Sequence, residues 1–378
     1  LPVVMVMDEL PAPRKRSTFI LDGGTYNKPT DVNVSEGTPA VLPPLPENQP
    51  RNRLTLARWL MQPEHPLTAR VTVNRYWQMF FGRGPVQTSE DFGSQGAKPT
   101  HPELLDWLAG RFIDSGWDVK ALHRLMVTSR TYRQSSRVTP ELLERDPENR
   151  LLARSPRYRM PSWMLRDQAL AVAGLLNPSF GGPSVRPYQP AGIWAEATFG
   201  KIRYTPDKGD RLYRRSLYVF WRRIVGPPMF FDAAKRQTCE VKPNLTNTPL
   251  HALTTLNETL YVEAARNMAQ RVIQQAADPA ARIRYAFRLV TARAPDELEL
   301  GYLNQRLTRF SKLFEDDLES ARDLLSTGDS PRDAEIGDKA EGIADAGSRI
   351  GRLLNHPLGH VPGGLHIEGF VQCGQGVQ

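Results

Sequence analysis

The chain has 378 residues, of which 40% are hydrophobic and 24% are charged, and its net charge is +8. This length allows two or three domains with their own cores, and the composition excludes a collagen-like fibre, a membrane bundle and wholesale disorder. The 49 basic residues do not gather in a stripe or tail. The charge distribution therefore argues against nucleic-acid binding.

No apolar stretch reaches the ~18 residues that a transmembrane helix needs, so we expect no membrane span. The two cysteines, Cys239 and Cys373, could form one bridge but not a disulfide framework. No CxxC or CxxCH motif occurs, which excludes a zinc ribbon and covalently bound c-type haem from this chain. The sequence therefore predicts neither a metal nor a cofactor here.

Residues 1–50 predict a small β-containing segment followed by a connector. Residues 3–7 and 17–21 are short apolar or β-branched runs, and Asp22-Gly23-Gly24 closes the second of them. These two runs predict two strands. Four prolines stiffen residues 40–50, which predicts a domain boundary near residue 50.

Helical patterns begin at residue 51. Apolar residues at i, i+3, i+4, i+7 and i+8 predict a long helix that ends at Gly82, and they are Val73, Tyr76, Trp77, Phe80 and Phe81. Thr100 and Glu103, with Pro102 between them, match a capping box that starts a second helix. Asp118 predicts the start of a third.

The sequence from Pro161 to residue 336 also contains helical patterns. Pro161 opens a helix to about residue 176, residues 217–221 resemble an isolated strand, and three more helical patterns fill residues 261–314. Glycines interrupt every helical pattern in residues 337–378, so we expect a tail outside any packed core. The predicted fold is mainly α, with a helical domain at 51–336, a β-containing N-terminal segment and long loops.

Polar side chains beside the first apolar stripe are candidate contact residues. Arg70, Asn74 and Gln78 follow at i, i+4 and i+8. They could contact a ligand, or they could satisfy carbonyl groups of the long loop at residues 83–99, and the second interpretation is favoured because buried polar groups need partners. Trp77 is a further candidate, since aromatic residues dominate binding hot spots.

Three side chains near the second predicted helix are candidate acid/base groups: Asp91, His101 and Glu103. Asp91-Phe92-Gly93 resembles a kinase motif, but neither a His-Arg-Asp loop nor a Val-Ala-Ile-Lys strand accompanies it. His101 would need at least one further ligand to hold a metal. Capping already accounts for Glu103.

Residues 231–257 form the strongest candidate segment, because they concentrate acid, thiol, amide and imidazole groups. The residues are Asp232, Arg236, Cys239, Asn247, His251 and Asn257. A nucleophilic cysteine needs a base and a lowered pKa, and His251 is near Cys239 only in sequence. The alternative is structural, with an Asp232–Arg236 salt bridge and Cys239 as a small core residue.

Several motifs lie within residues 50–330, and in chain order they include Asn52-Arg53-Leu54, Asn74-Arg75-Tyr76-Trp77, Thr100-His101-Pro102-Glu103, Ser129-Arg130-Thr131-Tyr132 and Thr246-Asn247-Thr248-Pro249. Together they resemble the planctomycete-type domain of unknown function 1553. The sequence departs from the family pattern at Pro161-Ser162-Trp163, where members usually have a small residue and a glutamate before the pair Arg166-Asp167.

The resemblance implies a location outside the cytoplasm, periplasmic or exported. It also implies a larger protein in which a c-type cytochrome segment, and hence haem c, precedes this domain. Members are associated with polysaccharide breakdown, so the implied partners are the cytochrome-bearing region and polysaccharide. The family has no assigned reaction.

We therefore expect an accessory or docking module. The expected contact residues are Arg70, Asn74, Trp77, Arg236, Asn247 and Asn257. The alternative is an enzyme acting on complex polysaccharide, whose acid/base groups would come from Asp232, His101, Glu103 and Asp91.

Overall fold

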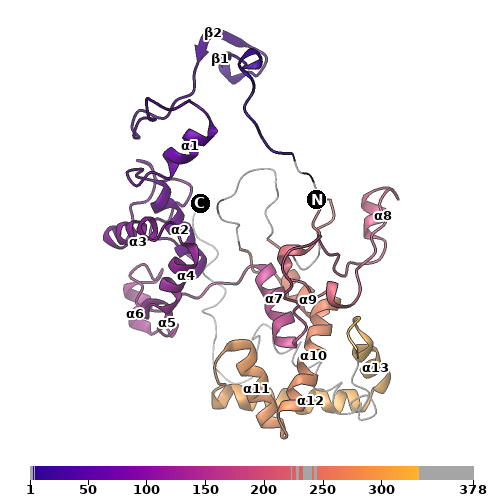
Figure 1. The fold of residues 1–378 in the computed structure, drawn as a ribbon. Helices are drawn as coiled ribbons and strands as arrows, with labels where there is room; N and C mark the ends of the chain where they lie inside the picture. The colour runs from indigo at the N-terminus through magenta and orange to yellow at the C-terminus, as the bar shows by residue number, and fades with distance from the viewer. Residues whose placement is uncertain are drawn as a thin grey trace. The chain divides into compact units, whose positions relative to one another are not determined.

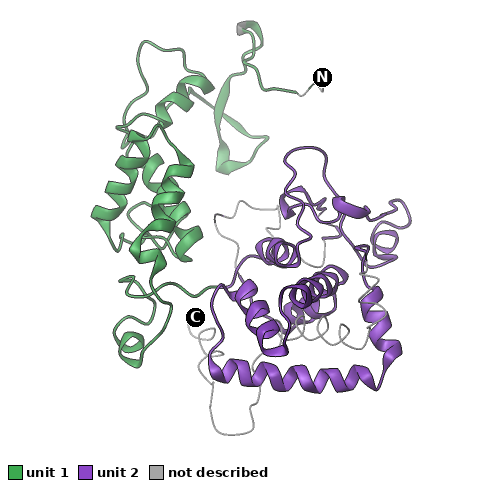
Figure 2. Cartoon of the chain, turned by 60° about the horizontal axis from the view of Figure 1, so that its bottom comes forward, with its two compact units in different colours: residues 1–158 green, residues 159–378 purple. Residues whose placement is uncertain are grey.

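The computed structural model describes residues 3, 5–222, 224–226, 230–232, 241 and 245–331. The chain forms two compact units, unit 1 at residues 1–158 and unit 2 at residues 159–378 (Figure 2). Helices are the predominant regular structure of the described residues, which otherwise contain loops and one two-stranded sheet, so the predicted mainly α fold is confirmed. The predicted boundary near residue 50 lies within unit 1, and the predicted tail at 337–378 lies outside the described residues.

The small sheet lies near the start of unit 1. Strand β1 (Thr18–Leu21) pairs antiparallel with β2 (Pro29–Val34), and the predicted strand at 17–21 is thus confirmed. The strand predicted at 3–7 is wrong, because the described residues of that run are unpaired. Gly23 and Gly24, with φ of 55° and 72°, reverse the chain after β1 and bring β2 beside it.

Six helices follow in unit 1 (Figure 1). They are α1 (Arg53–Leu60), α2 (Thr68–Phe81), α3 (Pro102–Asp114), α4 (Val119–Thr128), α5 (Arg130–Arg133) and α6 (Pro140–Arg145). The predicted apolar stripe lies on α2, and Gly82 ends the helix with φ 74°. Val73, Trp77 and Phe81 are buried against apolar residues of α3 and α4. Asp118 caps α4 as predicted, accepting a hydrogen bond from Ala121 N.

The predicted capping box at the start of α3 is wrong. His101, rather than Thr100, is the residue before the helix, and no side chain caps the helix there. The Thr100 hydroxyl instead donates to the Pro85 carbonyl at 3.4 Å, and the Thr100 amide donates to the same carbonyl at 2.9 Å. Because Thr100 is held by the preceding loop, its hydroxyl does not reach Glu103.

Unit 2 is built around one central helix. Its helices are α7 (Ser162–Ala173), α8 (Ile193–Ala197), α9 (Pro249–Asn257), α10 (Thr259–Gln275), α11 (Pro279–Thr291), α12 (Glu297–Glu315) and α13 (Leu318–Ser326). Helix α10 packs against α7, α9 and α11 (Figure 1). The helix predicted from Pro161 and the three predicted closing helices are confirmed as α7, α10, α11 and α12.

The isolated strand predicted at 217–221 is wrong. Residues Ser216–Tyr218 form a 3-10 helix, and Val219 then makes a single bridge to Val185. The Asp167 carboxylate accepts hydrogen bonds from the Ser216 amide and hydroxyl, which fixes the turn at this point. In the part of the chain that the structure describes, no helix is both long and apolar enough to cross a membrane.

Candidate functional site

The strongest candidate from the sequence, Asp232, lies in unit 2 at the meeting point of three distant segments. Its carboxylate accepts hydrogen bonds from the Thr246 amide at 2.8 Å and the Thr246 hydroxyl at 2.6 Å. The Arg159 guanidinium, from the segment before α7, donates to the same carboxylate. The Asp232 side chain is only 9% exposed, so Asp232 acts as a clamp between residues 159 and 246.

The clamp keeps Asp232 ionised. Burial by itself raises the pKa of Asp232, but the hydrogen bonds from Thr246 and the charge of Arg159 outweigh burial, and the pKa lies below its ordinary value. An ionised carboxylate has no proton to donate, so this geometry does not suit a general acid. Asp232 adopts φ 60°, and its three hydrogen bonds stabilise this left-handed conformation.

Phe231, the residue before Asp232, contacts both α7 and α9. The Phe231 ring stacks on His251 of α9, with centroids 4.1 Å apart, and the Arg159 guanidinium lies over the same ring. The Ser162 hydroxyl at the start of α7 donates to the Phe231 carbonyl at 2.8 Å. His251 also completes a capping box with Thr248 at the start of α9. The clamp and this stack therefore hold the first turn of α9 in place.

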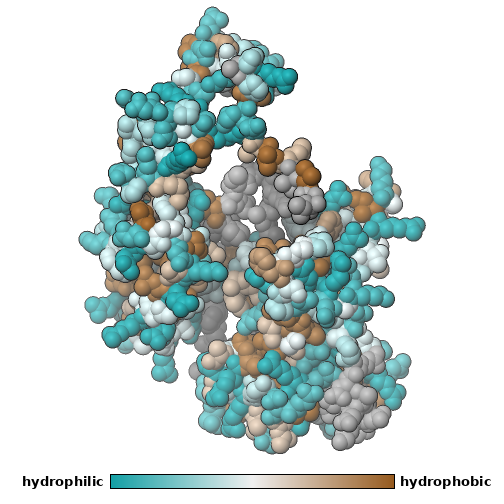
Figure 3. All heavy atoms as spheres, viewed as in Figure 1, coloured by the Kyte–Doolittle hydropathy of each residue, from teal (hydrophilic) through white to brown (hydrophobic). Residues whose placement is uncertain are grey.

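Helix α9 is held in place but is not covered. None of its nine residues is buried. Leu250 is 70% exposed and Leu253 is 53% exposed, and we call these two residues the α9 face. Figure 3 shows hydrophobic residues, in brown, among hydrophilic ones over the part of unit 2 where Figure 1 places α7 and α9. A short helix with outward apolar residues is a candidate interaction surface.

A buried arginine lies deeper in unit 2. Arg166 of α7 is completely buried and donates to the carbonyl oxygens of Leu212 and Arg214, both at 2.8 Å. Its neighbour Asp167 accepts from Ser216, as described above. These bonds fasten the long loop between residues 177 and 215 to α7, and satisfy carbonyl groups that burial would otherwise leave unpaired.

A second buried charge, Glu263, holds Ser330 of the last described segment by a hydrogen bond. Glu263 of α10 is completely buried and accepts hydrogen bonds from the Tyr213 hydroxyl at 2.8 Å and the Ser330 amide at 2.6 Å. The Arg266 guanidinium donates to the Ser330 carbonyl at 2.8 Å. Ser330, which is 7% exposed, is therefore held in the packed interior of unit 2.

Glu258 lies in an unusual environment for an acid. It precedes α10 and accepts a hydrogen bond from the Leu260 amide at 2.9 Å. Burial raises the pKa of Glu258 to about 7, despite the nearby positive charge of Arg166. Neither Glu258 nor Glu263 was among the residues predicted from the sequence. An acid directly before an apolar stripe signals a helix cap, but nothing in the sequence signals burial of its carboxyl group.

The raised pKa predicts a pH-dependent stability. Because the folded pKa of about 7 exceeds the ordinary value of 4.5, the contribution of Glu258 is fully present below pH 4.5 and is lost as pH rises through 7. Glutamine does not titrate, so the unfolding free energy of Glu258→Gln minus that of the natural protein should rise by about 3 kcal/mol between pH 4.5 and pH 8. Urea unfolding of both proteins at the two pH values measures this difference. Glu196→Gln is the control, because Glu196 is exposed. If the difference in unfolding free energy between Glu258→Gln and the natural protein were the same at both pH values, the raised pKa of Glu258 would be contradicted.

In unit 1, the polar residues of α2 support the neighbouring loop. Asn74 is completely buried, donates to the Val86 carbonyl at 3.0 Å and accepts from the Val86 amide at 2.8 Å. Gln78 accepts from the Ser89 hydroxyl at 2.7 Å. These contacts support the interpretation that the ridge satisfies the loop at 83–99. Arg70 differs, because it pairs with Asp106 of α3 at 2.6 Å.

Trp77 is 6% exposed and packs within the core of unit 1, which leaves almost no surface for a partner.

The three candidate acid/base groups of unit 1 make no described contact with one another. The Asp91 carboxylate accepts a hydrogen bond from the Gly93 amide at 2.7 Å. His101 Nδ1 lies 3.0 Å from the Thr100 hydroxyl oxygen, and Glu103 is exposed in the first turn of α3. Each of these candidate acid/base groups is thus found in a local contact or in solvent, and no described contact joins them.

The remaining predicted residues belong to unit 2. Arg236 and Cys239 lie outside the described residues, as does Cys373, so the predicted Asp232–Arg236 pair lies outside them too. Asn247 is exposed before α9, and Asn257 donates to the Leu253 carbonyl at 2.8 Å. Among described residues, no group of three His, Cys, Asp or Glu side chains could hold a metal ion.

Comparison with known proteins places the chain in a family. A family model described as a protein of unknown function, DUF1553 (PSD1), matches residues 52–307, which is about two thirds of the chain. No curated protein and no solved structure matches the sequence. The match includes α1 to α11 and therefore the Asp232 clamp, the α9 face and both buried charges. The chain belongs to the DUF1553 (PSD1) family.

Proposed function

We propose that this chain is an accessory docking module whose α9 face binds a protein partner. The observation that carries the proposal is the exposure of Leu250 and Leu253 on a helix with no buried residue. Apolar side chains of this size contribute binding energy when a partner removes them from water. The Asp232 clamp and the His251 stack hold this helix before the partner arrives, which lowers the entropy cost of binding.

The family resemblance supplies the class of partner. The resemblance implies a larger protein in which a c-type cytochrome segment precedes this domain, and a docking module would position that segment. The net charge of +8 favours a partner with an acidic surface. The same resemblance supports a location outside the cytoplasm and an association with polysaccharide breakdown, and both are part of this proposal.

Binding to an isolated cytochrome-bearing segment of a family member tests the proposal. We expect the double substitution Leu250→Asp and Leu253→Asp to raise the Kd at least tenfold, because two exposed apolar contacts become charged. Leu298→Asp on α12 is the matched control, since Leu298 is 81% exposed in the same unit. Isothermal titration calorimetry measures all three proteins. Equal affinities for the double variant and the natural protein would refute docking at α9.

The second candidate is an enzyme that acts on complex polysaccharide. Glu258 favours it, because a carboxyl group with a pKa of about 7 matches the needs of a general acid. A broad glycan and glycoside screen separates the two candidates. Saturable turnover that Glu258→Gln or Asp232→Asn abolishes, with the fold retained, would establish the enzyme instead of the docking module.

A further inference from the structure

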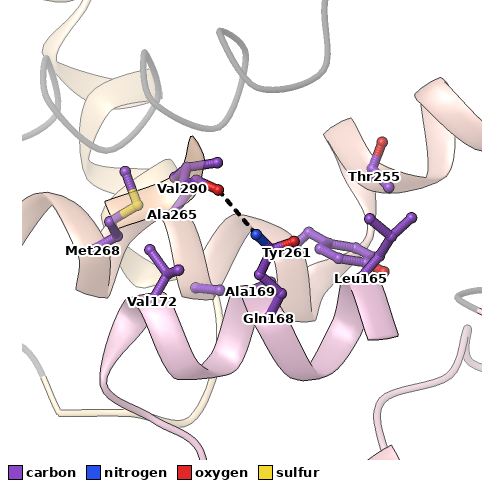
Figure 4. A pocket seen from close by; sticks show the side chains of 10 residues that line it. Leu165, Gln168, Ala169, Val172, Thr255, Tyr261, Ala265, Met268 and Val290 are labelled. Atoms are coloured by element: carbon purple, nitrogen blue, oxygen red, sulfur yellow. Dashed lines mark hydrogen bonds between the residues drawn. The ribbon is translucent and has the colours of Figure 1, made fainter. Parts of the chain in front are cut away.

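A cavity of about 170 Å³ lies beside α10 in unit 2, and most of the side chains that line it are apolar (Figure 4). Two of its polar groups are bound to the backbone. The Gln168 amide nitrogen donates to the Val290 carbonyl at 3.0 Å, the dashed line in Figure 4. The Thr255 hydroxyl donates to the His251 carbonyl at 3.1 Å. These groups are not free to select a ligand, so recognition by unit 2 depends on its surface.

Six non-glycine residues have a positive φ among the residues that the structure describes, and five of them have a structural reason for it. Trp117 and Leu152 pack against the apolar core of unit 1. The side chains of Asn149 and Asp232 make hydrogen bonds. Ala292 is small and ends α11.

The sixth residue, Phe199, differs because none of these reasons applies to it. It has φ 51°, and its side chain is 92% exposed. A left-handed conformation is unfavourable for a bulky residue but not for glycine, and the next residue, Gly200, adopts it with φ 73°. Folding alone would therefore favour glycine at position 199. Backbone strain of this kind is typical of residues that serve a function.

The backbone around Phe199 is held in place by α8. The Gly200 amide donates to the Ala195 carbonyl at 2.7 Å, and the Thr198 hydroxyl donates to the Trp194 carbonyl at 2.5 Å. Trp194 is 3% exposed and so anchors α8 in the packed part of unit 2. A partner that binds the Phe199 ring therefore does not have to order the backbone that carries it.

The surroundings of Phe199 favour a protein partner. A phenyl ring has no polar atom and gains most from an apolar pocket, and aromatic residues are enriched at protein interfaces. Lys201 and Arg203 follow closely in the chain, are both exposed, and outnumber the nearby acid Glu196, which favours acidic groups around that pocket. A sugar would need free hydrogen-bonding groups beside the ring, but the Thr198 hydroxyl is bound to the backbone.

We infer that Phe199 is an anchor residue, which the docking partner takes into an apolar pocket with acidic groups at its rim. This inference rests on the proposed function, because the partner is the same cytochrome-bearing segment. Phe199 and the α9 face both belong to unit 2. In Figure 1, α8 and α9 lie in the upper half of that unit, away from α11 and α12.

Calorimetry with the isolated cytochrome-bearing segment tests this role. Phe199→Asn removes the ring, and asparagine tolerates the left-handed backbone. We expect this variant to raise the Kd at least tenfold, and to leave the melting temperature unchanged or raise it by about 2 °C. Phe180→Asn is the matched control, because Phe180 is 90% exposed in the same unit without a positive φ, and its Kd should stay within about twofold of the natural value.

The outcomes separate this inference from docking at α9. If the natural chain binds the segment and Phe199→Asn binds equally well, Phe199 is not an anchor, whereas docking at α9 still depends on the Leu250→Asp and Leu253→Asp variant. A melting temperature several degrees lower for Phe199→Asn would make the ring structural and overturn the inference. Saturable binding of soluble xylan that Phe199→Asn abolishes would assign the ring to polysaccharide instead. If the natural chain does not bind the segment, both proposals fail.

Discussion

Gly328→Ala should lower the free energy of unfolding by about 4 kcal/mol. Gly328 has φ +92°, a conformation that costs an alanine about 1–2 kcal/mol. An added Cβ would also overlap the carboxylate of Glu263, which the Tyr213 hydroxyl and the Ser330 amide hold in place. Moving Glu263 aside breaks buried hydrogen bonds, at a further cost of about 1–3 kcal/mol.

Urea unfolding of natural and variant chains measures this loss. Gly301→Ala is the matched control, because Gly301 lies inside α12 with no atom within 4 Å of an added Cβ. Alanine is the better helix former, so this control should gain up to about 1 kcal/mol. If Gly328→Ala lost less than about 1 kcal/mol, the last described segment would not be fastened by Glu263.

Arg166→Met should lower the free energy of unfolding by about 3–5 kcal/mol. Methionine fills a similar volume but donates no hydrogen bonds, so the Leu212 and Arg214 carbonyls lose their buried donor. The carboxylate of Asp167, 3.4 Å from the guanidinium, also loses its positive neighbour. Removing one partner of a buried charge pair has an effect of this size.

Arg284→Met provides the comparison for this variant, because Arg284 is exposed on α11 in the same unit. Exposed substitutions change stability by about 0.5 kcal/mol or less. Urea unfolding should therefore separate the two arginine variants clearly. Equal stabilities would mean that Arg166 does not anchor the long loop.

The helices of this protein could be predicted because their signals are local. The apolar stripe of α2 and the Asp118 cap depend on residues within a few turns of one helix. The predicted capping box failed for the opposite reason, since Thr100 is bound by Pro85, fifteen residues earlier. A sequence window around Thr100 and Glu103 contains no sign of that competing carbonyl.

The candidate site could be predicted only in part, for the same reason. The segment around Asp232 was identified from its side chains, but its partner Arg159 lies 73 residues earlier in the chain. Burial of Glu263 depends on Tyr213 and Ser330, 50 and 67 residues away. A local pattern cannot show which of many acids such distant segments enclose.

Amide hydrogen exchange of the full chain, with and without the cytochrome-bearing segment, tests the docking proposal most directly. The proposal predicts slower exchange in α9, residues 249–257, on addition of the segment, because a bound partner protects the backbone of the helix that it covers. The Leu250→Asp and Leu253→Asp double variant should show no such change. Complex formation with unchanged exchange in α9 would contradict docking at this face.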